Sequence, residues 1–176
     1  MKAAVFLDRD GVLLRPKIIN EKAYAIRKIK DFKLLPGVAK SIEKIKKCGF
    51  LVFVVTNQPD IRNNLVTENL VNRIHKKIKT KLKIDDFAIC PHRQNEGCYC
   101  RKPSPGMILY LAKKYRINLK KSFMIGDRES DIKAGKKANC RTIFINNNYN
   151  ERKPKNQEAT FDSLMLAVDY IILSVT

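Results

Sequence analysis

The stretch Val5-Phe6-Leu7-Asp8-Arg9-Asp10-Gly11-Val12 decides the fold and the chemistry of this chain. It begins as an apolar run, which predicts a buried β-strand, and it ends in two carboxylates and a glycine turn. Side chains alternate along extended backbone, so we expect Asp8 and Asp10 on the same side of the chain. Two like charges this close repel, and a bound cation relieves the repulsion. The stretch therefore favours a Mg²⁺ site beside a carboxylate nucleophile, although an acidic turn after a strand also accounts for it when it is taken alone.

Short apolar runs alternate with helical patterns along the rest of the chain. We expect strands near residues 2–8, 50–56, 86–89, 122–126 and 141–145. Apolar residues at helical spacing predict five helices: from Pro36-Gly37 to Gly49, from Thr67 through Ile78, from Ser104-Pro105 through Leu111, from Asp131 to Lys137, and from Asp162 or Ser163 through Leu173. Such alternation predicts an α/β fold, a Rossmann-like three-layer sandwich whose central parallel sheet carries helices on both faces.

Two segments between these elements have no periodic pattern. We expect residues 13–33 to be irregular and to form a short flap near the first motif, and residues 146–157 to form a polar loop outside the core. The chain has 176 residues and shows neither a linker nor an internal repeat, so we predict a single domain, 1–176.

The composition is that of an ordinary globular protein, with 44% hydrophobic and 30% charged residues. No apolar run reaches the length of a membrane span, and the chain opens directly on the first strand. We therefore expect a cytoplasmic monomer with neither a membrane segment nor a signal peptide. Five cysteines in such a chain favour metal binding over disulfides. Two of them, Cys48 and Cys140, are interpreted as small buried hydrophobic residues.

The net charge of +19 is the one unusual feature of the composition. A basic surface attracts polyanions, which would fit a nucleic-acid partner. The basic residues are nevertheless spread along most of the chain, and Lys76, Lys77, Lys79 and Lys81 fit a solvated helix face. We therefore interpret the charge as a lysine-rich composition, helped by an anionic small-molecule substrate, and expect no nucleic-acid partner.

Three further motifs follow Asp8-Arg9-Asp10 in a fixed order. Thr56-Asn57-Gln58 ends the second apolar run, Arg101-Lys102-Pro103 precedes the third helix, and Gly126-Asp127 ends the fourth run with Asp131 four residues on. The set resembles the four motifs of the haloacid dehalogenase superfamily of phosphotransferases. The resemblance covers roughly residues 1–146, and we expect the tail to complete the same domain. In an open parallel sheet, ligands bind beyond the carboxyl ends of the strands, so these motifs can meet in one pocket.

The resemblance implies a role for the central motif residues. Asp8 would attack phosphorus and become an aspartyl-phosphate, and Asp10 would give a proton to the leaving group and later take one from water. Mg²⁺ would be held by the Asp8 carboxylate, the Asp10 carbonyl and Asp127. Thr56 and Lys102 would contact the transferring phosphoryl oxygens, where the transition-state charge is spread.

The remaining motif residues have less defined roles. We expect Asn57 and Gln58 to contact the substrate or the neighbouring loop. Arg128 stands where the superfamily commonly has lysine, and we expect it to bind substrate. Asp131 either orients the metal shell or lies on the helix surface as an ordinary acid.

A cysteine–histidine cluster precedes the third motif. Cys90, His92, Cys98 and Cys100 supply three thiolates and one imidazole within eleven residues, which satisfies a tetrahedral Zn²⁺; free or buried thiols are the plain alternative. Four protein ligands leave no position for water, so the zinc would be structural. The insert resembles the branch of the superfamily that contains the sugar-bisphosphate and histidinol-phosphate phosphatases.

The same branch implies a distinct task for Arg101, whose guanidinium could grip a second phosphate bidentately once zinc has fixed the loop. Pro59–Asn64 departs from the S-G-I-A-R-G sequence usual in the branch, and the zinc loop is shorter than in many members. Inserts after the first motif or the third strand act as caps in the superfamily. Here they amount to the flap and the small zinc-binding loop, so we expect no cap domain.

Four functions remain compatible with these residues. The resemblance favours a Mg²⁺-dependent phosphatase of a phosphorylated sugar, with D-glycero-D-manno-heptose 1,7-bisphosphate, cleaved at the 7-phosphate, as the leading substrate. Histidinol phosphate is the alternative within the branch, and a nucleic-acid 3′-phosphatase would share the aspartate chemistry. A zinc-stabilised binding module without catalysis is the fourth function, and the intact catalytic motifs argue against it.

Overall fold

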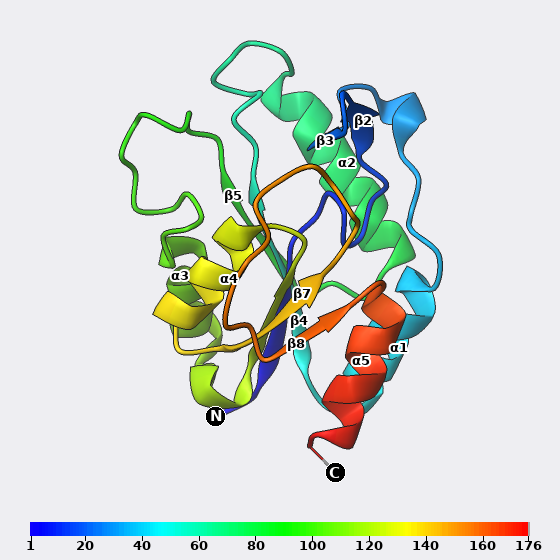
Figure 1. Ribbon diagram of the computed structural model, residues 1–176, viewed down its shortest axis with the longest axis vertical. Coiled ribbons are helices and arrows are strands. Elements are labelled where there is room, and N and C mark those ends of the chain that lie inside the picture. The colour runs from blue at the N-terminus through cyan, green and yellow to red at the C-terminus, as the bar shows by residue number, and fades with distance from the viewer. Residues whose placement is uncertain (176) are drawn as a thin grey trace.

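Six strands form one parallel sheet in the computed structural model, which describes residues 1–175 (Figure 1). They are β1 (Ala4–Leu7), β4 (Leu51–Asn57), β5 (Asp86–Cys90), β6 (Phe123–Gly126), β7 (Arg141–Ile145) and β8 (Ala159–Phe161). The order across the sheet is β5-β4-β1-β6-β7-β8, and every neighbouring pair is parallel. All of them except β8 are strands expected from the sequence. β1, which leads into the first motif, lies between β4 and β6.

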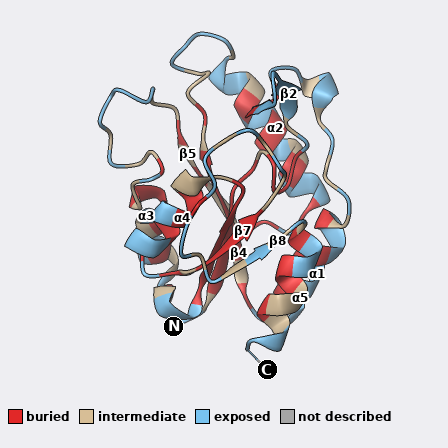
Figure 2. Ribbon diagram, viewed as in Figure 1, coloured by how far each residue is buried: buried red, intermediate tan, exposed pale blue. Residues whose placement is uncertain are grey.

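Five helices cover the two faces of the sheet: α1 (Val38–Lys47), α2 (Glu68–Lys81), α3 (Gly106–Tyr115), α4 (Glu129–Lys137) and α5 (Leu164–Leu173). The first two and α5 pack on one face, while α3 and α4 pack on the other (Figure 1). Figure 2 shows the buried residues gathered in the sheet and on the inner sides of these helices. The three-layer α/β sandwich expected from the sequence is confirmed.

The middle strand is buried on both faces, which explains its uninterrupted apolar sequence. Val5 and Leu7 point into the core shared with α1, α2 and α5, whereas Ala4 and Phe6 point into the core shared with α3 and α4. None of the four is exposed to solvent. Full burial of one large apolar side chain contributes about 1.5–3 kcal/mol, so the strand that delivers the first motif is firmly held.

Two helices begin at the caps that the sequence predicts. The Thr67 hydroxyl accepts a hydrogen bond of 3.2 Å from the Leu70 backbone N–H at the start of α2. The Ser163 hydroxyl accepts one of 3.4 Å from the Leu166 N–H at the start of α5. Such a cap stabilises a helix by about 1 kcal/mol. Just beyond α1 the chain turns at Gly49, whose φ of 82° suits glycine.

The segment 13–33, expected to be irregular, contains an antiparallel hairpin of β2 (Lys17–Ile19) and β3 (Lys22–Tyr24). Its turn, Asn20-Glu21, has φ of 47° and 61°, the left-handed values that a type I′ turn requires at both positions. This hairpin could not be recognised from the sequence, because its turn contains no glycine and each of its strands has only three residues. A short 3₁₀ helix, Ile29–Asp31, follows the hairpin, and another, Leu119–Lys121, precedes β6.

Two other features differ from the expectations. The sheet gains the edge strand β8, whose three partly exposed residues are too few to show a periodic pattern. Cys48, expected to be buried, is exposed because it caps the C-terminus of α1, where the chain leaves the core. Cys140 is buried, as predicted.

The connections that would hold a cap remain small. The connection after β1 holds the hairpin and a 3₁₀ helix, and the one after β5 holds the cysteine–histidine loop. Within residues 1–175 neither builds a separate domain over the sheet, as expected from the sequence. In the same described range, no helix is both long enough and apolar enough to cross a membrane.

Candidate active site

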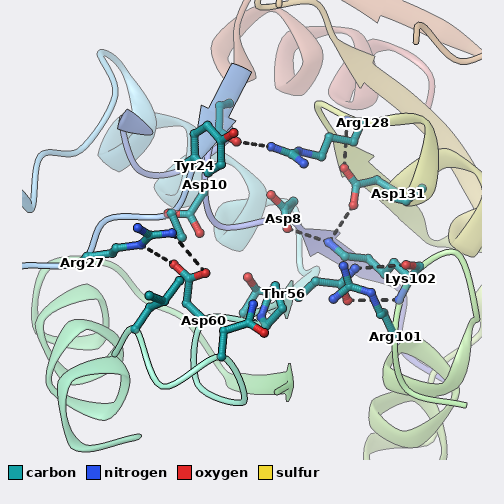
Figure 3. A pocket seen from close by; sticks show the side chains of 17 residues that line it. Asp8, Asp10, Tyr24, Arg27, Thr56, Asp60, Arg101, Lys102, Arg128 and Asp131 are labelled. Atoms are coloured by element: carbon teal, nitrogen blue, oxygen red, sulfur yellow. Dashed lines mark hydrogen bonds and ion pairs between the residues drawn. The ribbon is translucent and has the colours of Figure 1, made fainter. Parts of the chain in front are cut away.

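The carboxyl ends of β4, β1 and β6 lie side by side at one edge of the sheet, because these strands are adjacent and parallel. Asp8 directly follows β1, Thr56 lies near the end of β4, and Asp127 directly follows β6. Asp8 and Thr56 line a pocket of about 400 Å³ (Figure 3). The topology of the sheet thus gathers three motifs that are far apart in the sequence.

Lys102 supplies a positive charge at the floor of this pocket. Its Nζ lies 2.6 Å from Asp8 Oδ1 and 2.6 Å from Asp131 Oδ1 (Figure 3). It also donates to the carbonyl oxygen of Val55 at 2.8 Å. Burial lowers the pKa of Lys102, but the charges of Asp131 and Asp8 raise it by more, so the ammonium stays charged. Lys102 is therefore a fixed cation that is hydrogen-bonded to the Asp8 carboxylate.

Asp131 belongs to this floor and not to the helix surface. Only 1% of the residue is exposed, so the alternative that it is an ordinary surface acid is wrong. One carboxylate oxygen pairs with Lys102, and the other accepts a hydrogen bond of 3.0 Å from the Arg128 backbone N–H, which caps α4. Gly126 allows the approach, since a Cβ there would lie 2.1 Å from the Asp131 Cβ.

Three carboxylates at this edge suit a divalent cation. Asp8, Asp127 and Asp131 offer oxygen atoms that all lie within 4.8 Å of one another. Lys102 balances only one of the three charges, and Asp127 Oδ1 is buried without a hydrogen-bond partner in the described residues. Burial raises the pKa of Asp127 well above its ordinary value, and the charges of Asp8 and Asp131 add to this. Mg²⁺ prefers such oxygen ligands, so the residues present fit the ion.

Gly11 and Asn147 bring the Asp127 side chain close to the first motif. The φ of Gly11 is 97°, and a Cβ on this residue would lie 1.9 Å from Asp127 Oδ2, so only glycine fits. The side-chain amide of Asn147 donates to the Gly11 carbonyl at 2.9 Å and to Asp127 Oδ2 at 3.4 Å. The sequence predicts only a polar loop at Asn147. Its position just after β7, the strand next to β6, is the signal that could have identified it as a site residue.

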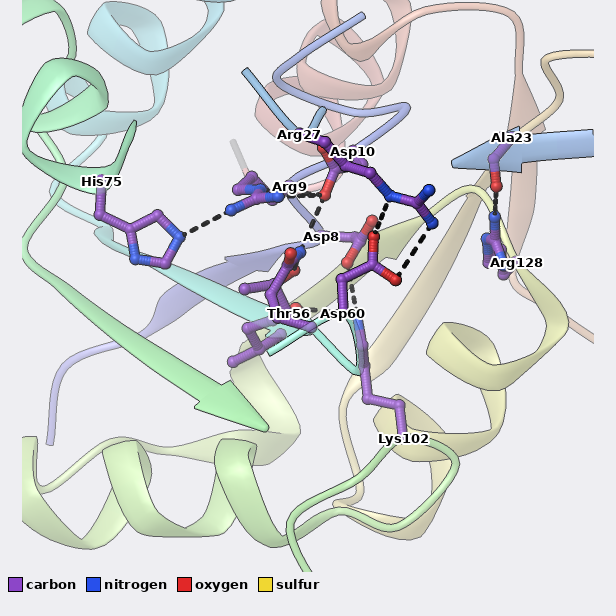
Figure 4. A network of polar contacts seen from close by, with 12 residues as sticks. Asp8, Arg9, Asp10, Ala23, Arg27, Thr56, Asp60, His75, Lys102 and Arg128 are labelled. Carbon is purple, nitrogen blue, oxygen red and sulfur yellow. Dashed lines mark hydrogen bonds and ion pairs between the residues drawn. The ribbon is translucent and has the colours of Figure 1, made fainter. Parts of the chain in front are cut away.

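Asp10 lines the pocket, and buried side chains next to it fix its carboxylate (Figure 4). Its Oδ2 accepts hydrogen bonds from Gln58 Nε2 at 3.0 Å and from Arg9 Nε at 2.9 Å. Gln58 also donates to Thr56 Oγ1 at 2.9 Å and is 2% exposed. Among the described residues Gln58 does not line the pocket; it links two residues that do. Arg9, to which the sequence had assigned no role, is completely buried.

Asn57 fixes the loop that carries Lys102. Its amide nitrogen donates to the Lys102 carbonyl at 3.0 Å, and its amide oxygen accepts from the Lys102 N–H at 3.1 Å. Of the two contacts expected for Asn57, with the substrate or with the neighbouring loop, the structure contains the loop contact. The reciprocal pair ties the third motif to the end of β4.

The mouth of the pocket is bridged on two sides by the β2–β3 flap (Figure 3). Arg27, just beyond the hairpin, forms an ion pair of 2.6 Å with Asp60 in the loop after β4. On the other side, the guanidinium of Arg128 donates to the carbonyl oxygen of Ala23 in β3. This side of the rim therefore combines two arginines, Arg27 and Arg128, with the carboxylate of Asp60.

The four expected zinc ligands gather beside this rim. The Sγ atoms of Cys90 and Cys98 are 3.6 Å apart, those of Cys98 and Cys100 are 3.5 Å apart, and His92 Nδ1 lies 3.6 Å from Cys90 Sγ and 3.2 Å from Cys100 Sγ. These spacings are too long for a disulfide and close to the ~3.8 Å between sulfurs in a tetrahedron of about 2.3 Å Zn–S bonds. The donor set therefore fits Zn²⁺.

The zinc loop is connected to the pocket through Arg101. The Arg101 guanidinium donates to the His92 carbonyl at 3.1 Å, and the same side chain lines the pocket. Gly106 lets the loop pack on α3, since a Cβ there would lie 2.4 Å from the Tyr99 carbonyl oxygen. The position of Arg101 therefore depends on the conformation of the cysteine–histidine loop.

Comparisons with known proteins agree with this arrangement. The HAD-hydrolase-like family model matches residues 99–167. A solved structure of D,D-heptose 1,7-bisphosphate phosphatase from B. bronchiseptica, complexed with magnesium and phosphate, has a TM-score of 0.84 and 26% identity, and 99% of each chain is covered.

Curated relatives are similar over most of their length. D-glycero-beta-D-manno-heptose-1,7-bisphosphate 7-phosphatase of Rhodopseudomonas palustris is 35% identical, covering 78% of this chain and 79% of the relative. D-glycero-alpha-D-manno-heptose-1,7-bisphosphate 7-phosphatase of Photorhabdus laumondii is 36% identical, covering 80% of each. The chain therefore belongs to the heptose-1,7-bisphosphate 7-phosphatase family of HAD-like phosphatases.

Proposed function

We propose that this chain is a Mg²⁺-dependent phosphatase that hydrolyses D-glycero-D-manno-heptose 1,7-bisphosphate at the 7-phosphate through an aspartyl-phosphate. The observation that carries the proposal is the buried contact of Lys102 with both Asp8 and Asp131, at the floor of a pocket with arginines at its mouth. A charged lysine keeps a carboxylate in place for attack, and the arginines suit a substrate with two phosphates. The names of the relatives support the same substrate.

In the proposed reaction an Asp8 oxygen attacks phosphorus while the bond to the sugar oxygen breaks, and the leaving oxygen takes a proton from Asp10. Water then attacks the aspartyl-phosphate and gives a proton to Asp10, which restores both residues and frees phosphate. Lys102 and Thr56 stabilise the charge on the transferring phosphoryl oxygens. Mg²⁺ bound by Asp8, Asp127 and the Asp10 carbonyl would offset the repulsion between carboxylate and phosphate. Asp131, which lies beside them, is a further carboxylate available to this ion.

We also propose that Cys90, His92, Cys98 and Cys100 hold a structural Zn²⁺. The support is the spacing of their four ligand atoms and the free state of the cysteines. The ion would fix a loop that has little apolar core of its own, and thereby the position of Arg101. Free cysteines also fit a reducing compartment, which supports a cytoplasmic location.

Arg101 is proposed to bind the phosphate that is not cleaved. A bidentate contact between a guanidinium and a phosphate is worth about 1.5–3 kcal/mol, or roughly ten- to a hundredfold in kcat/KM. The bisphosphate should therefore be a better substrate than the 7-monophosphate by this factor. Arg101→Ala should remove most of the preference. Arg73→Ala, an exposed arginine on α2 outside the pocket, is the matched control.

The experiment is a panel of phosphate-release assays with the purified zinc-loaded protein and Mg²⁺. It contains both anomers of the heptose 1,7-bisphosphate, the 7-monophosphate, histidinol phosphate and a 3′-phosphorylated oligonucleotide. We expect the highest kcat/KM for one bisphosphate anomer; the relatives carry the names of both. A higher kcat/KM for histidinol phosphate or for the oligonucleotide would refute the proposed substrate.

A further inference from the structure

A buried arginine occupies the middle of the first motif. Arg9 has no solvent exposure and is among the largest fully buried side chains of the described residues. A buried guanidinium is costly unless its charge and its donors are met. The contacts of Arg9 therefore reveal what it stabilises.

The charge of Arg9 is met by Asp10. Arg9 Nε donates a hydrogen bond of 2.9 Å to Asp10 Oδ2, whereas Arg9 Nη2 lies 2.8 Å from the same oxygen as an ion pair without hydrogen-bond geometry. The other oxygen, Asp10 Oδ1, is buried and has no hydrogen-bond partner in the described part of the chain. Hydrogen bonds thus fix Asp10 Oδ2, while Asp10 Oδ1 is free to carry the proton. A general acid and base needs a carboxylate that is held in place through one oxygen and exchanges the proton through the other.

A third residue holds the arginine in turn (Figure 4). His75, on α2, places its Nε2 3.2 Å from Arg9 Nη1. Its ring stacks on Phe87 of β5, with centroids 4.7 Å apart and planes 18° apart. Burial lowers the pKa of His75 to about 3, and the charge of Arg9 adds to this, so the ring is neutral and its Nε2 accepts the hydrogen bond.

We infer that His75 and Arg9 are positioning residues for Asp10: the imidazole fixes the guanidinium, and the guanidinium fixes the carboxylate that exchanges the proton. The inference rests on the proposed function, since it assigns to Asp10 the proton transfer described above. The chain of contacts runs from His75 on α2 through Arg9, just after β1, to Asp10 on the pocket wall. It links a helix that carries none of the four motifs to the chemical step.

The test compares two substrates that differ in their need for an acid. A sugar phosphate has a poor leaving group that must be protonated, whereas p-nitrophenyl phosphate releases p-nitrophenolate, a stable anion that leaves without protonation. The parameter kcat/KM reports the steps up to transfer of phosphate to Asp8. The ratio of kcat/KM for the heptose bisphosphate to that for the aryl phosphate therefore measures assistance by Asp10.

His75→Phe keeps a ring on Phe87 but removes the acceptor for Arg9. We expect this variant to lower the ratio by about ten- to a hundredfold, the size of a small misplacement of a catalytic group. His75→Gln, which retains an acceptor, should recover most of the ratio. A buried histidine with a merely structural role would affect both substrates equally, and equal losses or an unchanged ratio would overturn the inference.

Asp10→Asn separates this inference from the proposed function. If Asp10 is the acid, Asp10→Asn lowers the ratio more than any change at His75. An unchanged ratio in Asp10→Asn would refute the proton transfer itself, and with it the inference. A lowered ratio in Asp10→Asn together with an unchanged ratio in His75→Phe would refute only the positioning role. Should His75→Phe fail to fold in a thermal unfolding control, His75→Asn replaces it, because its shorter side chain cannot bring an acceptor to the position of His75 Nε2. A lower ratio in His75→Asn than in His75→Gln supports the positioning role, and equal ratios in the two variants overturn it.

Discussion

The floor and the rim of the pocket are held in different ways. Floor residues Asp8, Lys102, Asp127 and Asp131 are at most 7% exposed, and the ends of the packed sheet or the buried start of α4 position most of them. The rim consists of the β2–β3 flap, the Pro59–Asn64 loop and Arg101, which follows the cysteine–histidine loop. It depends on the partly exposed ion pair of Arg27 with Asp60 and on the four side chains proposed to bind zinc. The residues proposed to carry the chemistry are thus held by the core, while those proposed to bind the rest of the substrate lie on surface loops.

The largest effect is expected at the floor. Asp8→Asn should reduce kcat by at least about a thousandfold, because a carboxamide cannot attack phosphorus. The fold should survive, since the amide is nearly the same size and the strand below it is buried on both faces. Steady-state kinetics and thermal unfolding measure the two properties. Activity within tenfold of the unchanged protein would show that Asp8 is not the nucleophile. Asp162→Asn, an acid far from the pocket motifs in the sequence, is the control.

The floor should also make stability depend jointly on pH and Mg²⁺. Burial, with the charges of Asp8 and Asp131, raises the pKa of Asp127 above its ordinary value of 3.8. A carboxyl with a raised folded-state pKa contributes stability below its ordinary pKa, and this contribution is lost as the pH rises through the raised value. The metal-free protein should therefore lose stability in that range. Mg²⁺ favours the ionised form, so its stabilising effect should grow with pH.

The measurement is the melting temperature with and without Mg²⁺ at several values between about pH 5 and about pH 8. At a hundred times the dissociation constant, Mg²⁺ should add about 2.7 kcal/mol, or very roughly 5–10 °C. In Asp127→Asn the side chain carries no charge, so the pH dependence of the melting temperature and its increase on adding Mg²⁺ should both largely disappear. A Mg²⁺ effect in this variant as large as in the unchanged protein would place the ion elsewhere.

At the rim, Cys98→Ser tests how far a loop depends on its metal. We expect the zinc content to fall and the preference for the bisphosphate over p-nitrophenyl phosphate to drop by about tenfold, since Arg101 is held through the His92 carbonyl. Cys48→Ser, an exposed cysteine outside the cluster, is the matched control. Metal analysis and the two kcat/KM values decide the result. Full retention of zinc would show that Cys98 does not bind the metal. An equal loss of kcat/KM on both substrates would show that the cysteine–histidine cluster does not position Arg101.

The same division explains what the sequence could predict. Asp8 and Asp127 were found because they directly follow apolar strands, and parallel strands bring their carboxyl ends to one edge. Lys102 was found only through the resemblance of its motif, and the sequence left the place of Asp131 open. The residues that hold Asp10 in place were not found. His75 lies 66 positions from Arg9, and only the packing of α2 brings the two side chains together. The flap was missed because Asn20-Glu21 forms its turn without glycine. Contacts that form only when distant segments pack together produce no local pattern in the amino-acid sequence.

The smallest effect is expected at the flap, where Arg27 pairs with Asp60 at 2.6 Å. The Arg27 side chain is 41% exposed, and ion pairs of this kind contribute about 0.2–1 kcal/mol. Arg27→Ala or Asp60→Ala should therefore raise KM for the bisphosphate by at most about fivefold. If the pair acts as one bridge between the flap and the loop, the double variant should be no worse than either single variant. The pair of Lys44 with Asp169, also 2.6 Å and half-exposed but between α1 and α5, is the matched control and should leave KM unchanged. Additive losses in the double variant would mean that Arg27 and Asp60 act on the substrate separately and do not form one bridge.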